Sequence, residues 1–370
     1  MNKKLTSNLL SKIMKWDENK LMEEIPPLQF IAEMKYDLYD HFMPGTRFLG
    51  SLSVWLNKFD ENERKVMYEF VKDKLVFISS SQMTYLITLM CRVKVQKALI
   101  NKTAEKLGID SYKVKKIISD SEFNKLKRLS LFIGLSDGAH MDMIRRTLKL
   151  DNEQVITNYY PDKNKIHDIS ESIQKDQILA DISDKKISNV FLIDDFTASG
   201  TSFIREDGDR IKGKLKKVWD KLFIKDNGEG TFEQIISKNV SIHILFCIAT
   251  QRAITHIKNF IPQLKKGHDD ISIYVDCVQL IEDESSDNIK NDKNLEKILG
   301  RTTYINNENV LTKSFGVGKG EHHWMGYGDG ALPIVLSHNT PNNSILVLWQ
   351  SESDKDNNEY PSLFPRINRH

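Results

Sequence analysis

Val190-Phe-Leu-Ile-Asp-Asp-Phe-Thr-Ala-Ser-Gly-Thr-Ser202 is the stretch of this 370-residue sequence that decides the fold. Its four leading residues are apolar, and the acids Asp194 and Asp195 follow them directly. A short apolar run bounded by polar residues is typical of a strand that is buried on both faces of a parallel sheet. We therefore expect a buried strand that ends at the two acids, with both carboxylates facing solvent.

The small residues after the acids have the composition of a phosphate-binding loop. Small side chains at a helix start let backbone N–H groups close around a phosphate, which the positive end of the helix dipole also attracts. A glycine permits close approach or a positive φ, and hydroxyl groups add hydrogen-bond donors. Two adjacent carboxylates suit the two hydroxyl groups of a ribose as acceptors. The loop residues expected to bind substrate are Thr197, Ala198, Ser199, Gly200, Thr201 and Ser202.

Other phosphate motifs fit this stretch less well. A Walker A loop needs a lysine directly after its last glycine, whereas Thr201 follows Gly200 here. The GxGxxG pattern of dinucleotide-binding proteins does not occur in the sequence. The remaining alternative is an Asp-rich strand end whose Ser and Thr residues cap a helix. The ordered set of apolar strand, two acids and Thr-x-x-Gly-Thr favours a loop that binds a ribose and its phosphate.

From about residue 129 onward, short apolar runs alternate with helical patterns, which is typical of a parallel sheet covered on both faces. Ligands bind such sheets beyond the carboxyl ends of the strands. The expected fold class is therefore α/β, with a parallel-rich sheet in a domain over 129–370. The expected strands are 129–135, 154–159, 189–195, 240–249 and 271–281, and the expected helices are 141–148, 202–223 and 253–260.

Residues 1–128 are expected to form a helical N-terminal region, because their apolar residues recur at helical spacing. Asp60 and Glu63 form a capping-box pattern at one helix start. The stretch 103–117 resembles the first half of a helix-turn-helix, with Gly108 at the turn and lysines that could meet phosphates. The alternative is an αα-hairpin with a solvated face, so nucleic-acid binding stays open.

The amino-acid composition limits the expected binding partners and the expected cellular compartment. The 53 basic and 51 acidic side chains leave a net charge of +2, which gives no general reason to expect a polyanion partner. The three cysteines are far apart in sequence, as in a reduced cytoplasmic protein. The N-terminus carries charges where a signal peptide needs an apolar core, and no run of about 18 apolar residues occurs. We expect a soluble cytoplasmic protein with no membrane partner.

The stretch 190–202 resembles the phosphoribosyl pyrophosphate signature of type I phosphoribosyltransferases, in which an apolar strand leads into two acids and a Thr-x-x-Gly-Thr loop. The resemblance implies the sheet of that family and binding of 5-phosphoribosyl-1-pyrophosphate with Mg²⁺. It implies that Asp194 and Asp195 are catalytic, hold the ribose hydroxyls and hold the metal ion. It also implies that residues 197–202 bind the 5′-phosphate.

The same family has a pyrophosphate-binding loop after its first core strand, where this chain has 131–140. By that resemblance Asp137 is also catalytic and accepts a hydrogen bond from a Mg²⁺-bound water. The residues that would wrap the pyrophosphate are Ser136, Asp137, Gly138 and Ala139.

Two further features bear on the pyrophosphate, and the second of them has a counterpart in the family. Arg145 and Arg146 follow the pyrophosphate loop and would neutralise phosphate charge, or they are two solvated arginines of a helix. A mobile covering loop corresponds to 159–165, where Lys163 and Lys165 are candidates for contacting the pyrophosphate. Such a loop would exclude water from an activated sugar.

A second resemblance, to the phosphoribosyltransferase-like proteins of bacterial conflict and phage-defence systems, covers most of the chain. It rests on the 136–146 region and on the C-terminal segments 326–331, 337–343 and 360–366. The chain ends are expected to form a hood over the acceptor. The candidates for shaping an acceptor pocket there, or alternatively an Asx-rich turn, are His338, Asn339, Asn342 and Asn343.

Taken as it stands, this resemblance implies a phosphoribosyltransferase-like enzyme, an effector of antiphage defence that a partner protein of the same system could control. The alternative from another class is a sensor of phosphoribosyl pyrophosphate or a ribonucleotide that has lost transfer activity. A third is a nucleosidase-like or nucleotide-modifying toxin. The intact acids, both loops and the covering loop favour catalysis over sensing.

Overall fold

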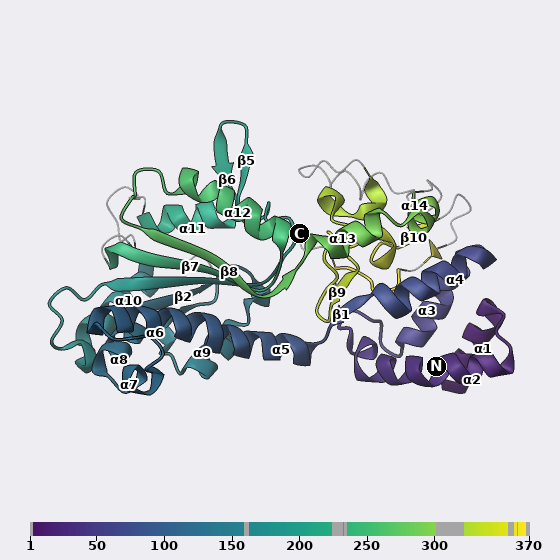
Figure 1. Ribbon diagram of the computed structural model, residues 1–370, viewed down its shortest axis with the longest axis horizontal. Helices are drawn as coiled ribbons and strands as arrows, with labels where there is room; N and C mark the ends of the chain where they lie inside the picture. Colours follow the sequence, from purple (N-terminus) through teal and green to yellow (C-terminus); the bar gives the residue numbers. More distant parts are fainter. Residues whose placement is uncertain are drawn as a thin grey trace. The chain divides into compact units, whose positions relative to one another are not determined.

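A computed structural model describes residues 3–158, 163–223, 232, 235–300, 322–353, 359–360 and 362–367 of the chain (Figure 1). The chain forms two compact units, one made of Met1–Gln82 with Glu282–His370 and the other of Met83–Ile281. The predicted division after residue 128 is a different partition, which falls inside the second unit. No helix in these described ranges is long and apolar enough to cross a membrane.

The first unit combines helices from both ends of the chain. The capping box predicted at Asp60 and Glu63 is present. Strands β1 (Val76–Ile78) and β9 (Ile334–Leu336) pair in parallel, and the short β10 (Glu352–Ser353) and β11 (Glu359–Tyr360) pair antiparallel. The helices are α1 (Lys3–Met14), α2 (Glu18–Met34), α3 (Phe48–Asn57), α4 (Glu61–Glu69), α13 (Asp283–Lys290) and α14 (Lys293–Leu299).

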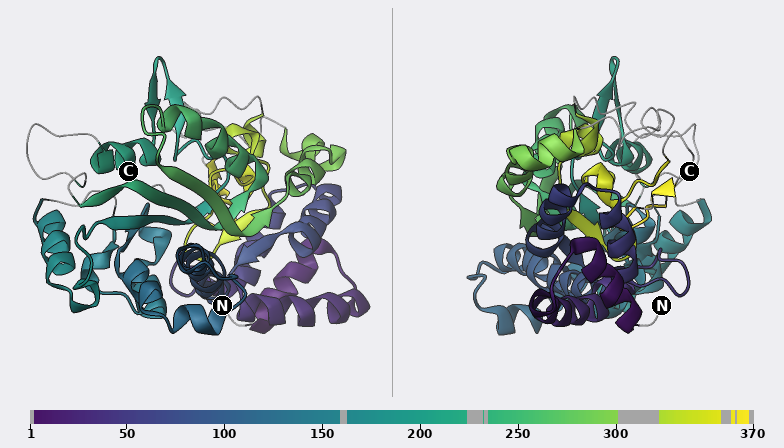
Figure 2. Two further views of the ribbon diagram at one scale, coloured as in Figure 1. Left: turned by 60° about the vertical axis from the view of Figure 1, so that its left-hand side comes forward. Right: turned by 90° about the vertical axis from the view of Figure 1, so that its right-hand side faces the viewer.

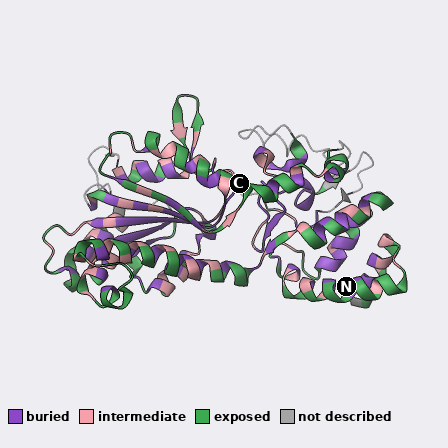
Figure 3. Cartoon of the chain, in the orientation of Figure 1, coloured by how far each residue is buried: buried purple, intermediate pink, exposed green. Residues whose placement is uncertain are grey.

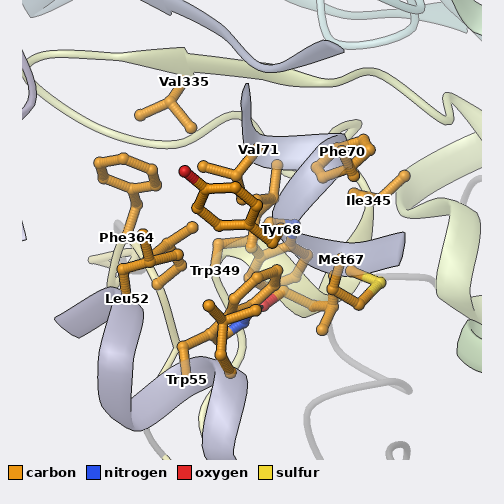
Figure 4. Close-up of a cluster of buried hydrophobic side chains, with 14 of the residues drawn as sticks. Leu52, Trp55, Met67, Tyr68, Phe70, Val71, Val335, Ile345, Trp349 and Phe364 are labelled. Carbon is orange, nitrogen blue, oxygen red and sulfur yellow. Dashed lines mark hydrogen bonds between the residues drawn. The ribbon is translucent and has the colours of Figure 1, made fainter. Parts of the chain in front are cut away.

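Buried side chains from the N-terminal helices and the C-terminal tail pack together in this unit (Figure 4). Trp55 is fully buried, and its Nε1–H donates to the carbonyl of Val347 at 2.9 Å, across 292 residues of sequence. Phe364 stacks on Phe48 with ring centroids 5.6 Å apart. Burying one such side chain stabilises the fold by roughly 1.5–3 kcal/mol. The two chain ends therefore share one core.

The second unit contains a five-stranded parallel sheet in the order β3-β2-β4-β7-β8. The strand predicted at Val190–Ile193 is central, as expected. The chain goes from β2 outward to the edge strand β3 and then crosses back to β4 on the other side of β2. The winding direction therefore changes between β2 and β4. Ligands of such sheets bind at this point, beyond the carboxyl ends of the strands. The strands are β2 (Ser130–Gly134), β3 (Val155–Ile156), β4 (Ile187–Thr197), β7 (Ile236–Thr250) and β8 (Ser272–Ile281).

Helices cover both faces of this sheet, which confirms the predicted α/β class (Figures 1 and 2). Helices α10 (Lys163–Lys175), α11 (Lys214–Phe223) and α12 (Gln251–Leu264) share one buried cluster with alternate residues of β4. The other face carries α6 (Gln96–Leu107), the preceding π-helical turn η3 (Met90–Val95) and α9 (Met141–Leu148). The central strands are consequently buried on both faces, as Figure 3 shows.

The region before the sheet is helical, as predicted, and includes α5 (Ser80–Leu89), α7 (Val114–Ile118) and α8 (Ser121–Arg128). Gly108 ends α6 in the left-handed conformation with φ +63°, so the predicted turn is present. The five residues of α7 form less than one and a half helical turns, which is short for a recognition helix. The structure matches the αα-hairpin alternative better than a helix-turn-helix.

The predicted helix over 202–223 is wrong in its first half. An antiparallel hairpin of β5 (Arg205–Asp207) and β6 (Arg210–Lys212) precedes α11, which begins only at Lys214. The dipeptide Gly208-Asp209 at the hairpin turn was the available signal, since Gly-Asp between two short strands is typical of a two-residue hairpin loop. Helical periodicity in the rest of the stretch obscured it.

Candidate functional site

Asp194 and Asp195 lie inside β4 and are buried. The strand continues to Thr197, because Thr197 still pairs with Ala249 of β7. Asp194 is 1% exposed and Asp195 is 8% exposed, so the predicted solvent-facing orientation is wrong. Successive side chains of a strand point to opposite faces. The two carboxylates therefore leave β4 on opposite sides and have different neighbours.

Asp194 is held by three hydrogen bonds. Its Oδ1 accepts from the hydroxyl of Ser136 and, at 3.0 Å, from the backbone N–H of Asp195, while its Oδ2 accepts from Lys214 Nζ at 2.9 Å. Burial, followed by repulsion from Asp195, raises the pKa of Asp194 to about 7, and Lys214 and Ser136 act in the opposite direction. The ion pair therefore offsets only part of the cost of burying this carboxylate.

The predicted pyrophosphate loop lies directly against Asp195. Gly138 is buried, and a Cβ atom there would approach Asp195 Oδ2 to 2.5 Å, so only glycine fits without displacing the carboxylate. Asp137 begins a 3₁₀ turn over Asp137–Ala139, and its side chain is exposed. The structure thus brings the loop after β2 and the acids of β4 together at the switch point of the sheet.

The loop 197–202 is anchored to the start of α12. The hydroxyl of Thr250, the N-cap residue of α12, donates to the carbonyl of Ala198 and accepts from the N–H of Ala253 at 3.0 Å. Gly200 has φ +75°, and a Cβ atom there would meet the ring of His256 at 2.9 Å. Both the backbone angle and the packing against α12 therefore require glycine at this position.

The hydroxyl groups of this loop lie at its more open side. Thr197 and Ala198 are buried, whereas Ser199 and Thr201 are half-buried and Ser202 is exposed. The hydroxyls of Ser199 and Thr201 form a hydrogen bond with each other at 2.8 Å. Each hydroxyl can both donate and accept, so an anion beside the loop could recruit them as donors.

The hairpin is an insertion into the helix that follows this loop. The N–H of Phe203 bonds to the carbonyl of Gly200 at 3.0 Å, which makes a first turn. After the hairpin, the N–H of Lys214 bonds to the carbonyl of Ser202 at 3.1 Å, so α11 continues from that turn. This connection places Lys214 at the acid pair, with its Nζ 2.9 Å from Asp194 and 4.7 Å from the centroid of the Phe203 ring.

Sequence reasoning missed Lys214 and also Arg205, whose Nη1 donates to the carbonyl of Thr201 at 3.2 Å. Neither Lys214 nor Arg205 belongs to a local sequence pattern. Their positions at the site depend on the hairpin that lies between the loop 197–202 and α11. Gly213 makes that return with φ +123°, in close contact with the backbone of Phe203. A glycine directly before a helix was the one signal in the sequence.

The predicted arginines and lysines that the structure describes lie in the helices α9 and α10. Arg145 is half-buried and Arg146 is exposed, and both lie in the last turn of α9, at the far end from the loop 136–139. Of the predicted covering loop, residues 159–162 lie outside the described residues. Lys165 belongs to α10, where its Nζ donates to the carbonyl of Asn152 at 3.1 Å.

The asparagines predicted to shape an acceptor pocket hold the backbone of the first unit. The side-chain amide of Asn339 donates to the carbonyl of Ile367 at 3.0 Å, and that of Asn343 donates to the carbonyl of Tyr327 at 2.9 Å. The carbonyl of His338 lies 2.7 Å from the Nε2 atom of His41. These contacts match the alternative of an Asx-rich turn, and they leave the acceptor pocket a prediction.

The residues at the acid pair fit Mg²⁺ only together with a ligand that brings oxygen atoms of its own. Within the described ranges, no cluster of three or more His, Cys, Asp and Glu side chains could hold a metal ion. Ser136 and Lys214 already engage the oxygens of Asp194, and Asp195 is the less buried acid. Mg²⁺ typically binds one or two carboxylates together with substrate phosphates and water. The site suits that mode of binding.

Comparison with known proteins gives one match. The PRTase-CE family model, which describes phosphoribosyltransferases of conflict systems, matches residues 52–366. No curated protein and no solved structure matches the chain. The matched range contains both loops and the acid pair, and it extends over parts of both compact units.

Proposed function

The chain belongs to the PRTase-CE family, and from that premise we propose that it transfers a phosphoribosyl group from 5-phosphoribosyl-1-pyrophosphate in the presence of Mg²⁺. The bond between ribose C1 and the pyrophosphate oxygen breaks, and pyrophosphate leaves with the electron pair. A new bond forms between C1 and a nucleophilic atom of the acceptor. The setting we propose is antiphage defence in the cytoplasm, with control by a partner protein of the same system.

The observation that carries this proposal is the contact between the loop 136–139 and the acid pair. Gly138 permits the loop to approach the carboxylate of Asp195 so closely that a Cβ atom would lie 2.5 Å from it. The ribose and the pyrophosphate of the donor are joined by a single oxygen atom. A site for the donor therefore needs its ribose acceptors and its pyrophosphate donors side by side, and this contact supplies that arrangement.

The proposed roles follow from the positions of the three segments. Asp194 and Asp195 accept hydrogen bonds from the ribose hydroxyls, and the loop 197–202 holds the 5′-phosphate with its hydroxyls and N–H groups. Backbone N–H groups of 136–139 stabilise the charge that develops on the leaving pyrophosphate. Arg145 and Arg146 are retained only as distant contributors of positive charge.

When bound, Mg²⁺ would neutralise charge on the pyrophosphate. Asp194 and Asp195 are the proposed carboxylate ligands, and Asp195 is the more exposed of the two. Asp137 is exposed and would accept a hydrogen bond from a water molecule of the metal. Residues 159–165 remain the candidate for a loop that keeps bulk water away from the activated sugar.

A second candidate function is a sensor that binds the donor or a ribonucleotide without transferring the sugar. The observation in its favour is that Asp194 is almost completely buried and already engaged by Lys214 and Ser136. A ligand that hydrogen-bonds to Asp194 competes with Lys214, the first residue of α11. Binding would then be coupled to the position of α11 and of the hairpin before it.

Release of pyrophosphate separates the two functions. The purified chain is incubated with the donor, Mg²⁺ and a panel of bases, nucleotides and the neighbouring partner protein. For an enzyme, Asp137→Ala should lower turnover more than donor affinity, because the loop acts mainly on the leaving group. Asp142→Ala, an exposed acid on α9, is the matched control. Donor binding without any release across the panel would instead establish the sensor.

A further inference from the structure

A ladder of four stacked rings crosses the sheet on the face that carries α6 and η3. Phe132, Phe191, His243 and Tyr274 occupy matched positions on β2, β4, β7 and β8. Consecutive ring centroids lie 4.8, 4.7 and 4.9 Å apart, and the ring planes differ by 12°, 16° and 15°. These spacings equal the distance between neighbouring strands, about 4.8 Å, so the sheet itself sets the stacking.

The ladder ends at Tyr274. The rings of Phe132 and Phe191 are fully buried, whereas Tyr274 is 53% exposed, because β8 is the edge strand of this sheet in the described residues. Burial, with a smaller contribution from Lys102, lowers the pKa of His243 to about 4, so the ring beneath Tyr274 is uncharged at neutral pH. A flat aromatic group can therefore extend the ladder by one step at its open end.

A cavity of about 560 Å³ opens beside this end of the ladder. Residues 241, 243 and 245 of β7 and 272, 274 and 276 of β8 form one wall, as expected for alternate side chains on one face. The opposite wall comes from η3 and α6. The volume of the cavity is in the range of sites that bind small molecules, about 300–1,000 Å³.

The cavity has an excess of positive charge. Three lysines and two acids line it, and one of those lysines, Lys94, pairs with Asp276 at 2.7 Å. Lys102 donates only to uncharged acceptors, at 2.9 Å to the carbonyl of Ser188 and at 3.1 Å to the side chain of Ser241. Lys97 is exposed at the rim. A phosphate would find an available ammonium group at Lys97, whereas the charge of Lys102 is partly compensated by Glu105, the second acid of the cavity.

We propose that this cavity is a second ligand site, which binds a free nucleotide with its base stacked on Tyr274 and its phosphates at Lys97. A planar base extends the ladder, whereas an aliphatic ligand would not use the exposed ring. The site lies on the α6 face beside β8, away from the loops 136–139 and 197–202. It does not depend on the proposed transfer reaction.

Isothermal titration of the full chain with ATP, GTP, CTP and UTP, one at a time and in EDTA, tests the proposal. EDTA removes the metal that the donor site requires. At least one nucleotide should bind, and Tyr274→Ala should weaken that binding by roughly tenfold or more, as expected for the loss of one stacking contact. Tyr274→Phe should bind within about twofold of the wild type, because it keeps the ring.

Two matched controls accompany these variants. Tyr85→Ala removes a tyrosine of α5 that is 63% exposed, and Lys115→Met removes an exposed lysine of α7; neither should change binding. Lys97→Met should weaken binding of a nucleoside triphosphate more than binding of the matching nucleoside. The variant with Asp194→Asn and Asp195→Asn should bind nucleotides like the wild type, which keeps this test separate from that of the donor site.

The proposal is overturned if no nucleotide binds the wild type in EDTA, or if Tyr274→Ala binds as tightly as the wild type. An equal loss in Tyr85→Ala would show a general effect on folding. Loss of binding in the Asp194 and Asp195 variant would place the nucleotide in the donor site. A ten-residue oligo-dT that binds more than a hundredfold tighter than every nucleotide would show that single-stranded nucleic acid is the ligand.

Discussion

Lys214 Nζ lies 2.9 Å from Asp194 Oδ2, and this ion pair joins the start of α11 to the middle of the central strand. The carboxylate is buried on a strand whose other acid points to the opposite face. The lysine therefore compensates one of two adjacent charges, and the loop after β2 contacts both acids, through Ser136 at Asp194 and Gly138 at Asp195.

Asp194 should make the stability of the free protein depend on pH. Its pKa in the folded state, about 7, lies above the ordinary value of 3.8. Below about pH 4 the carboxyl is protonated in both the folded and the unfolded state, and its full contribution to stability is present. As the pH rises from about 4 through about 7, the unfolded state ionises first, so the free energy of unfolding falls. Asp194→Asn should remove this dependence, so the variant gains stability relative to the wild type between pH 5 and pH 8.

Urea midpoints at several pH values, without Mg²⁺, measure the effect, and Asp142→Asn is the exposed control. A difference between Asp194→Asn and the wild type that stays constant from pH 5 to pH 8 would contradict the assignment.

Gly138→Ala should displace the carboxylate of Asp195, since the new Cβ atom would otherwise approach Oδ2 to 2.5 Å. We expect donor affinity to fall by at least about tenfold, or ~1.4 kcal/mol. A double-mutant cycle isolates the cause: in an Asp195→Ala background, the same glycine substitution should have little further effect. Equal losses in both backgrounds would mean that the glycine acts on the loop alone.

Thr250→Val should destabilise the second unit and loosen the phosphate loop together. The substitution keeps the shape of the side chain but removes both the N-cap bond to Ala253 and the bond to the Ala198 carbonyl. Loss of an N-cap costs about 1 kcal/mol, and the second bond adds to that cost. Urea unfolding and donor titration measure the two effects. Thr255→Val, on the exposed side of α12, should change neither.

The sequence allowed prediction of the sheet because its signals are local. The buried strand at Val190–Ile193 and the helix Met141–Leu148 both appear where their hydrophobic patterns place them. The Asp-Asp pair could be singled out for the same reason, whereas the loop after β2 is identified by the resemblance to phosphoribosyltransferases. Parallel strands then bring the two segments to one edge of the sheet.

The remaining features depend on contacts between segments that are distant in sequence. Nothing near Asp194 indicates that Lys214 returns to it, because that depends on a hairpin inserted into the following helix. Likewise, the hydrogen bond from Trp55 to Val347 joins the chain ends in one unit, and a periodic pattern does not show which apolar face it meets. The burial of both acids follows from the segments that cover the two faces of β4, with Ser136 and Lys214 at Asp194 and Gly138 at Asp195, which the apolar run alone did not reveal.

Calorimetric titration with 5-phosphoribosyl-1-pyrophosphate and Mg²⁺ tests the central claim most directly. The wild type is compared with the variant that carries both Asp194→Asn and Asp195→Asn, and with Asp142→Asn as the control for an exposed acid. Circular dichroism establishes that each variant is folded. We predict that the wild type and the control bind the donor, and that the double variant loses at least about tenfold in affinity, because each amide is a poorer acceptor for a ribose hydroxyl and a poorer ligand for Mg²⁺. Unchanged affinity in the folded double variant would contradict the assignment of the acid pair to the donor.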